Sequence, residues 1–327
     1  MKEIIANFSK QILKAIEIGE NSDFQPTDKK INAVLVCGLG GSGIGGKIVS
    51  LLVAKELKVP FLTVNDYEIP AWVDENTLVI ASSYSGNTEE TLAALEMCVK
   101  RGAEIAAITS CGTLADMAKT NGWNVHLIPG GEQPRAMLAY SLVQQIFLLQ
   151  KYGLISDKTG QQLKNVPQMI DDLEERIRMK AVTLAKNVYN KTVIIYAGPL
   201  FEGVAVRFRQ QINENSKELC WHHILPEMNH NELVGWGGGD ASIGVIIFRN
   251  DSDHERTKVR MDLSRGIYNK YTDTVLEVMS KGNSNVERAF YHILLGDWIS
   301  IHMAEANNVD PIEIKVIDFL KSELGKI

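Results

Sequence analysis

The chain has 327 residues, enough for two domains of ordinary size, and its formal net charge of −6 argues against a broad nucleic-acid-binding surface. Hydrophobic residues make up 45% and charged residues 23%, as in globular proteins, and no apolar run reaches the roughly 18 residues that a membrane span needs. Because the N-terminus also lacks the apolar core and cleavage site of a signal peptide, we expect a cytoplasmic protein that binds neither nucleic acid nor a membrane.

The first half alternates strand and helix patterns after an N-terminal amphipathic helix. That helix is indicated by apolar residues at helical spacing, namely Ile4, Ile5, Phe8, Ile12, Leu13 and Ile16. Strands are expected at 31–37, 61–64, 78–82, 104–109 and 125–128, and helices at 42–57, 88–101 and 136–151. Strands separated by helices of this length predict βαβ units and a parallel sheet.

The second half repeats this order of elements after a charged helical stretch that begins near residue 157. Strands are expected at 192–198, 220–225 and 241–248, and helices from residue 203 and at 253–266, 286–307 and 311–324. We therefore predict an α/β protein of two tandem flavodoxin-like domains, each a parallel sheet flanked by helices. The first domain would comprise residues 1–153 and the second residues 154–327.

Two loops rich in glycine and hydroxyl side chains follow buried strands of the first half. One runs from Gly38 to Gly46 and the other from Ser82 to Thr91. Each precedes a helical pattern, so backbone N–H groups and hydroxyls would gather at a helix N-terminus, where anions bind favourably. Two such loops at the carboxyl ends of neighbouring parallel strands would frame one pocket for a phosphate group.

Other interpretations of these loops remain open. Gly38, Gly40 and Gly43 fit a dinucleotide fingerprint, and the stretch from Gly41 to Lys47 is close to a P-loop but lacks the hydroxyl that would follow the lysine. The glycines could serve only close packing between strand and helix. Likewise, Ser85 or Thr88 could serve only as a helix N-cap. The cluster of hydroxyls in the second loop favours a phosphate monoester.

Candidate acid–base groups lie in the second half. Glu214 is flanked by amides, which resembles a held base, although a surface pair with Lys217 is the alternative. The other polar side chains of the helix expected from residue 203, among them Arg207, Gln211 and Asn215, could form a solvated face. His230 lies between two asparagines in a polar loop and is a candidate for proton transfer, with Glu227 and Glu232 as rival groups.

The ligand patterns of metal sites are missing from the sequence. His222 and His223 are adjacent, so their side chains diverge, and His254 with Glu255 forms no recognisable ligand set. The four cysteines are scattered without a CxxC pair, namely Cys37, Cys98, Cys111 and Cys220. We expect free thiols and neither a disulfide nor a metal.

Taken together, the two loops, the segment 210–217 and the segment 226–232 resemble the double-domain sugar isomerase (SIS) proteins. The bifunctional phosphoglucose/phosphomannose isomerase family is the most similar, and the resemblance spans nearly the whole chain. It implies tandem SIS domains, a homodimer, and reversible isomerisation of glucose 6-phosphate or mannose 6-phosphate with fructose 6-phosphate. It implies no metal and no other cofactor.

The resemblance also implies roles for individual residues. The phosphate would be bound by Gly41, Ser42, Ser83, Ser85 and Thr88. Glu214 would move a proton between C1 and C2, and Arg135 would face the enediolate. His230, contributed across the dimer interface, and Lys321 would open the sugar ring, with Lys315 as the alternative lysine.

Three other functions remain as alternatives. A non-catalytic SIS protein that senses a sugar phosphate would share the loops but would leave Glu214, His230 and Lys321 without a role. An NAD-dependent oxidoreductase would use the dinucleotide fingerprint. Amino-sugar chemistry on the same fold ranks low, because no glutaminase domain is recognisable.

Overall fold

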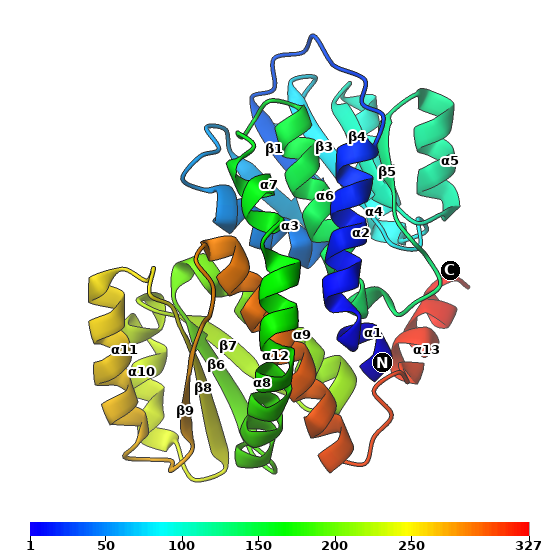
Figure 1. Ribbon diagram of the computed structural model, residues 1–327. Coiled ribbons are helices and arrows are strands. Elements are labelled where there is room, and N and C mark those ends of the chain that lie inside the picture. The colour runs from blue at the N-terminus through cyan, green and yellow to red at the C-terminus, as the bar shows by residue number, and fades with distance from the viewer. Residues whose placement is uncertain (327) are drawn as a thin grey trace.

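The computed structural model describes residues 1–326 and contains two parallel sheets, each with helices on both faces (Figure 1). The first sheet has five strands in the order β2-β1-β3-β4-β5, and the second has four in the order β7-β6-β8-β9. Every neighbouring pair is parallel. Both sheets therefore begin with the flavodoxin-like order 2-1-3-4, which confirms the predicted internal repeat.

The strands of the first sheet lie within two residues of their predicted bounds. They are β1 (Ala33–Cys37), β2 (Phe61–Val64), β3 (Thr77–Ser82), β4 (Glu104–Thr109) and β5 (Asn124–Leu127). Every residue of β1 and β3 is buried, because both strands are internal and covered on both faces.

The helices of the first half are α1 (Lys2–Ala6), α2 (Phe8–Asn21), α3 (Gly40–Val53), α4 (Glu89–Lys100), α5 (Gly112–Asn121), the 3₁₀ helix η1 (Pro134–Ala136) and α6 (Leu138–Lys151). Two predictions were incomplete here. The N-terminal helix is divided in two, and Leu13 is exposed and lies outside its apolar face. The helix α5 was not predicted, because it buries only Leu114 and Ala118 and so has little apolar periodicity.

The second half begins with α7 (Lys158–Leu163) and α8 (Val166–Asn187). Its strands are β6 (Thr192–Ala197), β7 (Trp221–Ile224), β8 (Ile243–Arg249) and β9 (Val275–Met279). Strand β9 was not predicted. It forms one edge of its sheet and only Val278 in it is fully buried, so its sequence lacks the continuous apolar run of an internal strand.

The remaining elements of this half are η2 (Pro199–Phe201), α9 (Glu202–Gln211), the π-helical turn η3 (Ile212–Ser216), η4 (Glu227–His230), α10 (Glu232–Gly235), η5 (Trp236–Gly238), α11 (Glu255–Tyr268), α12 (Asn285–Ala306) and α13 (Lys315–Leu324). The last helix begins four residues later than predicted. We keep the domain boundary near residue 154 as a proposal, since all strands of the first sheet precede it and all strands of the second follow it.

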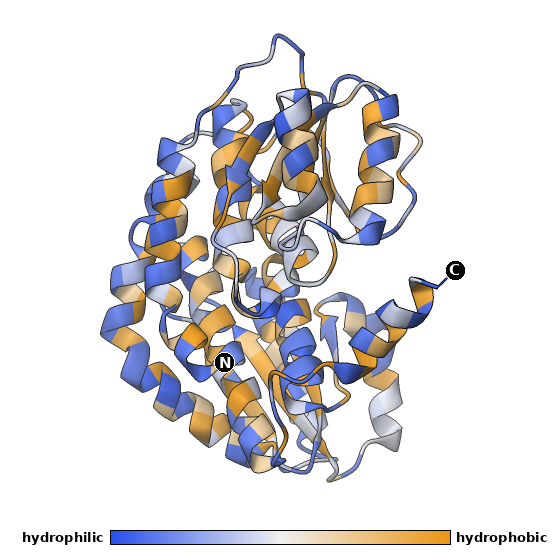
Figure 2. Ribbon diagram, turned by 90° about the vertical axis from the view of Figure 1, so that its right-hand side faces the viewer, coloured by the Kyte–Doolittle hydropathy of each residue, from blue (hydrophilic) through white to orange (hydrophobic). Residues whose placement is uncertain are grey.

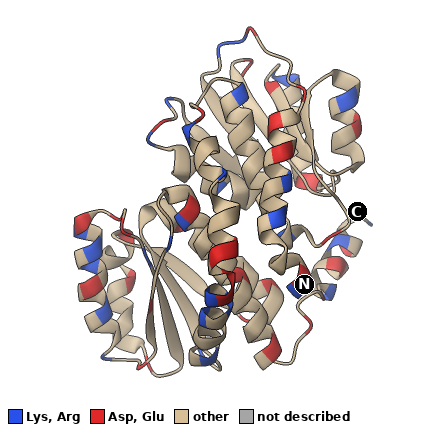
Figure 3. Ribbon diagram, in the orientation of Figure 1, with Lys and Arg blue, Asp and Glu red and all other residues tan. Residues whose placement is uncertain are grey.

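One hydrophobic core runs between the two sheets and includes side chains of α2, α3, α6, α8, α9 and α12. Smaller clusters fill the outer faces, beneath α4 and α5 on the first sheet and beneath α11 on the second. Most strand residues carry no charge (Figure 3). The equivalent helices α3 and α9 approach so closely that a Cβ atom on Gly203 would lie 3.0 Å from the backbone nitrogen of Ile48.

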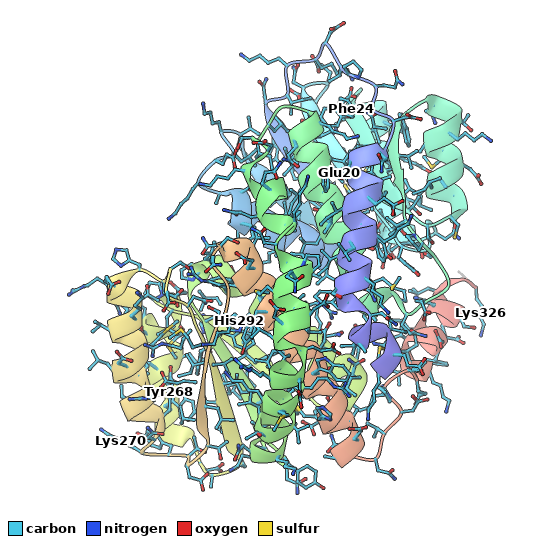
Figure 4. The ribbon with its side chains drawn as sticks, viewed as in Figure 1. Glu20, Phe24, Tyr268, Lys270, His292 and Lys326 are labelled. Atoms are coloured by element: carbon cyan, nitrogen blue, oxygen red, sulfur yellow. The ribbon has the colours of Figure 1, made fainter. Side chains whose placement is uncertain are left out.

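The C-terminal helix α13 is unusual because none of its residues is buried. It projects from the body (Figure 2). Its exposed apolar side chains are Val316, Ile317, Phe319, Leu320 and Leu324. Lys326 lies just beyond its outer end (Figure 4). None of the helices within residues 1–326 is long and apolar enough to cross a membrane.

The close contact of α3 with α9 can be tested with Gly203→Ala. We expect a loss of about 1–3 kcal/mol in the free energy of unfolding, because two packed backbones would have to separate. In Gly266→Ala, also within a helix, the new methyl group meets nothing within 4 Å. That control should be stabilised by up to about 1 kcal/mol. Urea unfolding of both variants measures the difference, and equal stabilities would contradict it.

Candidate functional site

The two glycine and hydroxyl loops lie together, as predicted, because β1 and β3 are neighbours. The Oγ atom of Ser42 accepts a hydrogen bond from the backbone nitrogen of Tyr84 at 3.2 Å. The strand order changes direction at β1: β2 lies on one side of β1, and β3, β4 and β5 follow on the other. Ligands of open α/β sheets bind at such a switch point.

The hydroxyl loop after β3 forms a compact turn. Ser83 is buried, and its Oγ atom lies 2.8 Å from the Oγ1 atom of Thr88. Ser85 Oγ accepts from the backbone nitrogen of Asn87 at 3.3 Å. Gly86 has φ +70°, and a Cβ atom there would collide with the Cys111 carbonyl oxygen, so the turn requires glycine.

The capping interpretation of Thr88 is not supported by its contacts. Thr88 occupies the N-cap position of α4, but its side chain makes no capping hydrogen bond and contacts Ser83 instead. The first N–H groups of α4 therefore remain available at the positive end of the helix dipole. The turn can accept an anion.

Some glycines of the loop from Gly38 to Gly46 do serve close packing between helix and strand. A Cβ atom on Gly43 would lie 2.2 Å from the carbonyl oxygen of Gly38, and one on Gly46 would lie 2.7 Å from Thr63 Oγ1. These glycines let α3 lie against the sheet. Gly41 differs, because it faces the η1 turn: its Cβ position is 3.5 Å from the Cα atom of Arg135. The glycine loop thus adjoins a basic residue.

Arg135 and Glu214 form the pair at the centre of the candidate site. The Nη1 atom of Arg135 lies 3.4 Å from Oε2 of Glu214. Only 5% of the Arg135 side chain is exposed, whereas 31% of the Glu214 side chain is exposed. The predicted alternative, a surface pair with Lys217, is wrong, because Lys217 donates to the backbone oxygen of Glu214 and not to its carboxylate.

Several acceptors hold the Arg135 guanidinium. Its Nε donates to Asn215 Oδ1 at 2.8 Å, and its Nη2 donates to the carbonyl oxygens of Pro311 and Ile312. Burial lowers the pKa of Arg135, and the nearby Glu214 carboxylate opposes that shift. The result is a positive charge with little freedom to move.

The turn that carries Glu214 has π-helical geometry. The helix α9 widens into η3 and ends at Lys217, which has φ +59°. Turns of this kind occur frequently at functional sites. Glu214 lines a cleft of about 490 Å³ together with Lys217, Leu219, Val316 and Ile317. A ligand in this cleft could therefore reach the carboxylate.

The predicted histidine lies elsewhere in the second half. His230 is exposed at the end of η4, and no hydrogen bond or ion pair within residues 1–326 joins it to Glu214 or Arg135. The rival carboxylates have structural contacts. Glu232 accepts from the Tyr196 hydroxyl and lies 2.8 Å from His223 Nδ1, while Glu227 accepts from Asn231 at 2.9 Å.

Both candidate lysines lie on α13. Lys315 and Lys321 are exposed, and neither side chain has a hydrogen bond or ion pair with another described residue. Ile317, which lies on the same helix, lines the cleft of Glu214. The structure therefore brings this helix to the cleft but does not bring either lysine into contact with Glu214.

Sequence reasoning missed a set of buried polar residues behind the pair. The interpretation of the α9 polar residues as a solvated face is wrong for Arg207, Gln211 and Asn215, which are buried. Arg207 Nη2 lies 3.1 Å from Oδ1 of Asp297 on α12. Asp297 is the one acidic residue in the mostly apolar stretch 289–304, and this was the available signal, since a buried carboxylate needs a partner.

All four cysteines are free, two of them buried. Among the described residues, no group of three or more His, Cys, Asp or Glu side chains could hold a metal ion.

Comparisons with known proteins show which family the chain resembles. Residues 29–152 match the SIS domain family, and residues 177–324 match the family described as the bacterial phospho-glucose isomerase C-terminal SIS domain. A Caldicellulosiruptor bescii protein named bifunctional phosphoglucose/phosphomannose isomerase is 38% identical over 100% of this chain and 99% of its own length. An Aquifex aeolicus protein of the same name is 35% identical over 90% of each chain.

A solved structure has the same fold. A hypothetical protein of Thermus thermophilus matches with a TM-score of 0.79, covering 99% of this chain and 90% of its own, at 16% sequence identity.

The hydroxyl turn predicts how Thr88→Val should behave. The variant keeps the shape of the side chain but removes the hydroxyl that contacts Ser83. We expect inorganic phosphate to bind about tenfold or more weakly, because a hydrogen bond to a charged group contributes about 1.5–3 kcal/mol. The exposed Thr120, on α5, supplies the matched control Thr120→Val. Phosphate titration followed by NMR measures both, and equal affinities would remove Thr88 from the site.

Proposed function

This chain belongs to the bifunctional phosphoglucose/phosphomannose isomerase family, and we propose that it interconverts glucose 6-phosphate and mannose 6-phosphate with fructose 6-phosphate. The observation that carries the proposal is the accessible carboxylate of Glu214 beside the buried guanidinium of Arg135, next to the glycine loop. Aldose–ketose exchange needs one base and one fixed positive charge, and this pair supplies both.

The proton transfers follow from that pair. In the open-chain aldose, Glu214 takes the proton from C2 and returns it to C1. A proton also passes from the C2 oxygen to the C1 oxygen, so that the aldehyde becomes a hydroxyl and C2 becomes the carbonyl. The intermediate enediolate carries negative charge on oxygen, which Arg135 stabilises without having to reorganise.

The phosphate loops contribute remote binding energy. Gly41, Ser42, Ser83, Ser85 and Thr88 hold the phosphate, which positions C1 and C2 at Glu214. Each step needs only proton transfer and a fixed charge, so we propose a reaction without metal or other cofactor. The free thiols of all four cysteines support a reducing compartment and hence a cytoplasmic location.

Ring opening needs two further proton-transfer groups, for which we propose His230 and Lys321. Because no hydrogen bond or ion pair within residues 1–326 joins His230 to Glu214, we propose a homodimer in which His230 reaches the site of the other copy. The exposed apolar face of α13, with Val316, Phe319 and Leu320, supports an interface between copies. In such a dimer, Lys321 on α13 would lie beside a site formed by both copies.

Loss of the base should separate catalysis from binding. In Glu214→Gln we expect the rate of fructose 6-phosphate conversion to fall about 10²–10⁴-fold while fructose 6-phosphate still binds. The control Glu218→Gln alters a carboxylate that lines the same cleft and should remain active. The assay follows glucose 6-phosphate and mannose 6-phosphate in the presence of EDTA. A wild-type protein that binds the sugar phosphate but forms neither product would support the non-catalytic alternative.

The shared site can be tested by mixing two inactive variants. If His230 acts across the interface, subunit exchange between Glu214→Gln and His230→Ala proteins gives dimers with one intact site. About a quarter of the wild-type activity should return, since half of randomly paired dimers are mixed. Size-exclusion chromatography with light scattering establishes the dimer beforehand. Mixed dimers without activity would place His230 in the site of its own chain.

A further inference from the structure

A buried ion pair lies behind the candidate site and contacts Arg135 directly. Arg207 on α9 and Asp297 on α12 are 2% and 4% exposed, and their side chains approach to 3.1 Å. Gln211 Nε2 donates to Asp297 Oδ1 at 2.8 Å. The Nη2 atom of Arg207, which makes the contact with Asp297, also donates to the main-chain carbonyl oxygen of Arg135.

Stability alone does not account for this pair. A buried ion pair rarely stabilises a protein more than apolar residues of similar size, because both charges lose their hydration. Arg207 also leaves its Nε–H without a hydrogen-bond partner among the described residues. An unsatisfied buried donor is costly. The guanidinium is thus oriented toward the Arg135 main chain at the expense of its own hydrogen bonding.

We propose that Arg207 is a positioning residue for the isomerisation: held by Asp297, it fixes the main chain of Arg135 and so keeps that guanidinium beside Glu214. Arg207 touches no substrate and acts only through Arg135. The inference rests on the proposed isomerase function and adds to it a residue for which the reaction chemistry has no direct role.

A second path from the same helix supports the Arg135 side chain. Ser300 lies one turn after Asp297 on α12, and its Oγ accepts from Asn215 Nδ2 at 2.9 Å. Asn215 Oδ1 in turn accepts from Arg135 Nε at 2.8 Å. The main chain of Arg135 is therefore held through Arg207 and Asp297, and its side chain through Asn215 and Ser300. Loss of either set of contacts would move the Arg135 guanidinium relative to Glu214.

The test removes both buried charges together. The double variant Arg207→Met with Asp297→Asn keeps the approximate volume and an oxygen acceptor for Gln211, so no unpaired charge remains to unfold the protein. We expect kcat for fructose 6-phosphate to fall about ten- to a hundredfold, the cost of a small misplacement of a catalytic group. KM should change by less than about twofold, because the phosphate loops hold most of the remote binding energy.

The matched control is Arg249→Met. Arg249 also forms ion pairs, with Asp262 at 2.8 Å and with Glu277 at 2.6 Å, but it lies at the end of β8. Its kcat should equal that of the wild type. Thermal unfolding of every variant accompanies the kinetics, so that a loss of folded protein is not mistaken for a loss of positioning.

A folded double variant with wild-type kcat would overturn the inference. An equal fall in kcat in the control Arg249→Met would overturn it as well. Should the double variant fail to fold, Arg207→Lys takes its place, because the shorter lysine side chain cannot place its nitrogen where Nη2 of Arg207 contacts both Asp297 and the Arg135 carbonyl oxygen. Reduced kcat at an unchanged melting temperature supports the inference, and wild-type kcat in that variant refutes it. An inactive wild type would instead refute the proposed function.

Discussion

A guanidinium that must stay buried beside a carboxylate open to a cleft is the constraint that organises this molecule. A buried cation is unfavourable unless its donors are satisfied. Arg135 meets that requirement through Asn215 and the carbonyl oxygens of Pro311 and Ile312. The loop after β5, the π-helical turn after α9 and the segment after α12 are thereby joined at one point. A charge held in this way can stabilise an oxyanion without first reorganising.

The two repeats contribute different chemistry to the candidate site. The switch point of the first sheet gathers backbone N–H groups and hydroxyls at helix N-termini, where an anion can bind. The equivalent edge of the second sheet contains a carboxylate of the protein itself. Asp253 accepts from the backbone nitrogen of Asn250 at 2.9 Å, and its Oδ1 lies 2.6 Å from the Cβ position of Gly198. A negative charge there opposes binding of a phosphate, which supports the proposal that the first repeat binds the phosphate and the second supplies the acid–base residues.

Much of the fold could be predicted from local patterns. Internal strands such as β1 and β3 are continuous apolar runs that end at glycine or serine, so their bounds and their parallel arrangement follow from the sequence. The prediction failed where burial is slight. The helix α5 and the edge strand β9 bury few side chains, and without a buried face the periodicity that identifies an element is weak.

The sequence by itself determined the tandem α/β architecture and the meeting of the two glycine and hydroxyl loops, because each loop directly follows a strand and the ends of parallel strands share one edge. Only the tertiary structure decided which charges meet. Arg135 contacts Asn215 across 80 positions, and Arg207 contacts Asp297 across 90. No local spacing records such contacts, because they arise where α9, α12 and η1 pack together. Packing also decided that Glu214 pairs with Arg135 and not with Lys217. It decided as well that Arg207 is buried and not part of a solvated face.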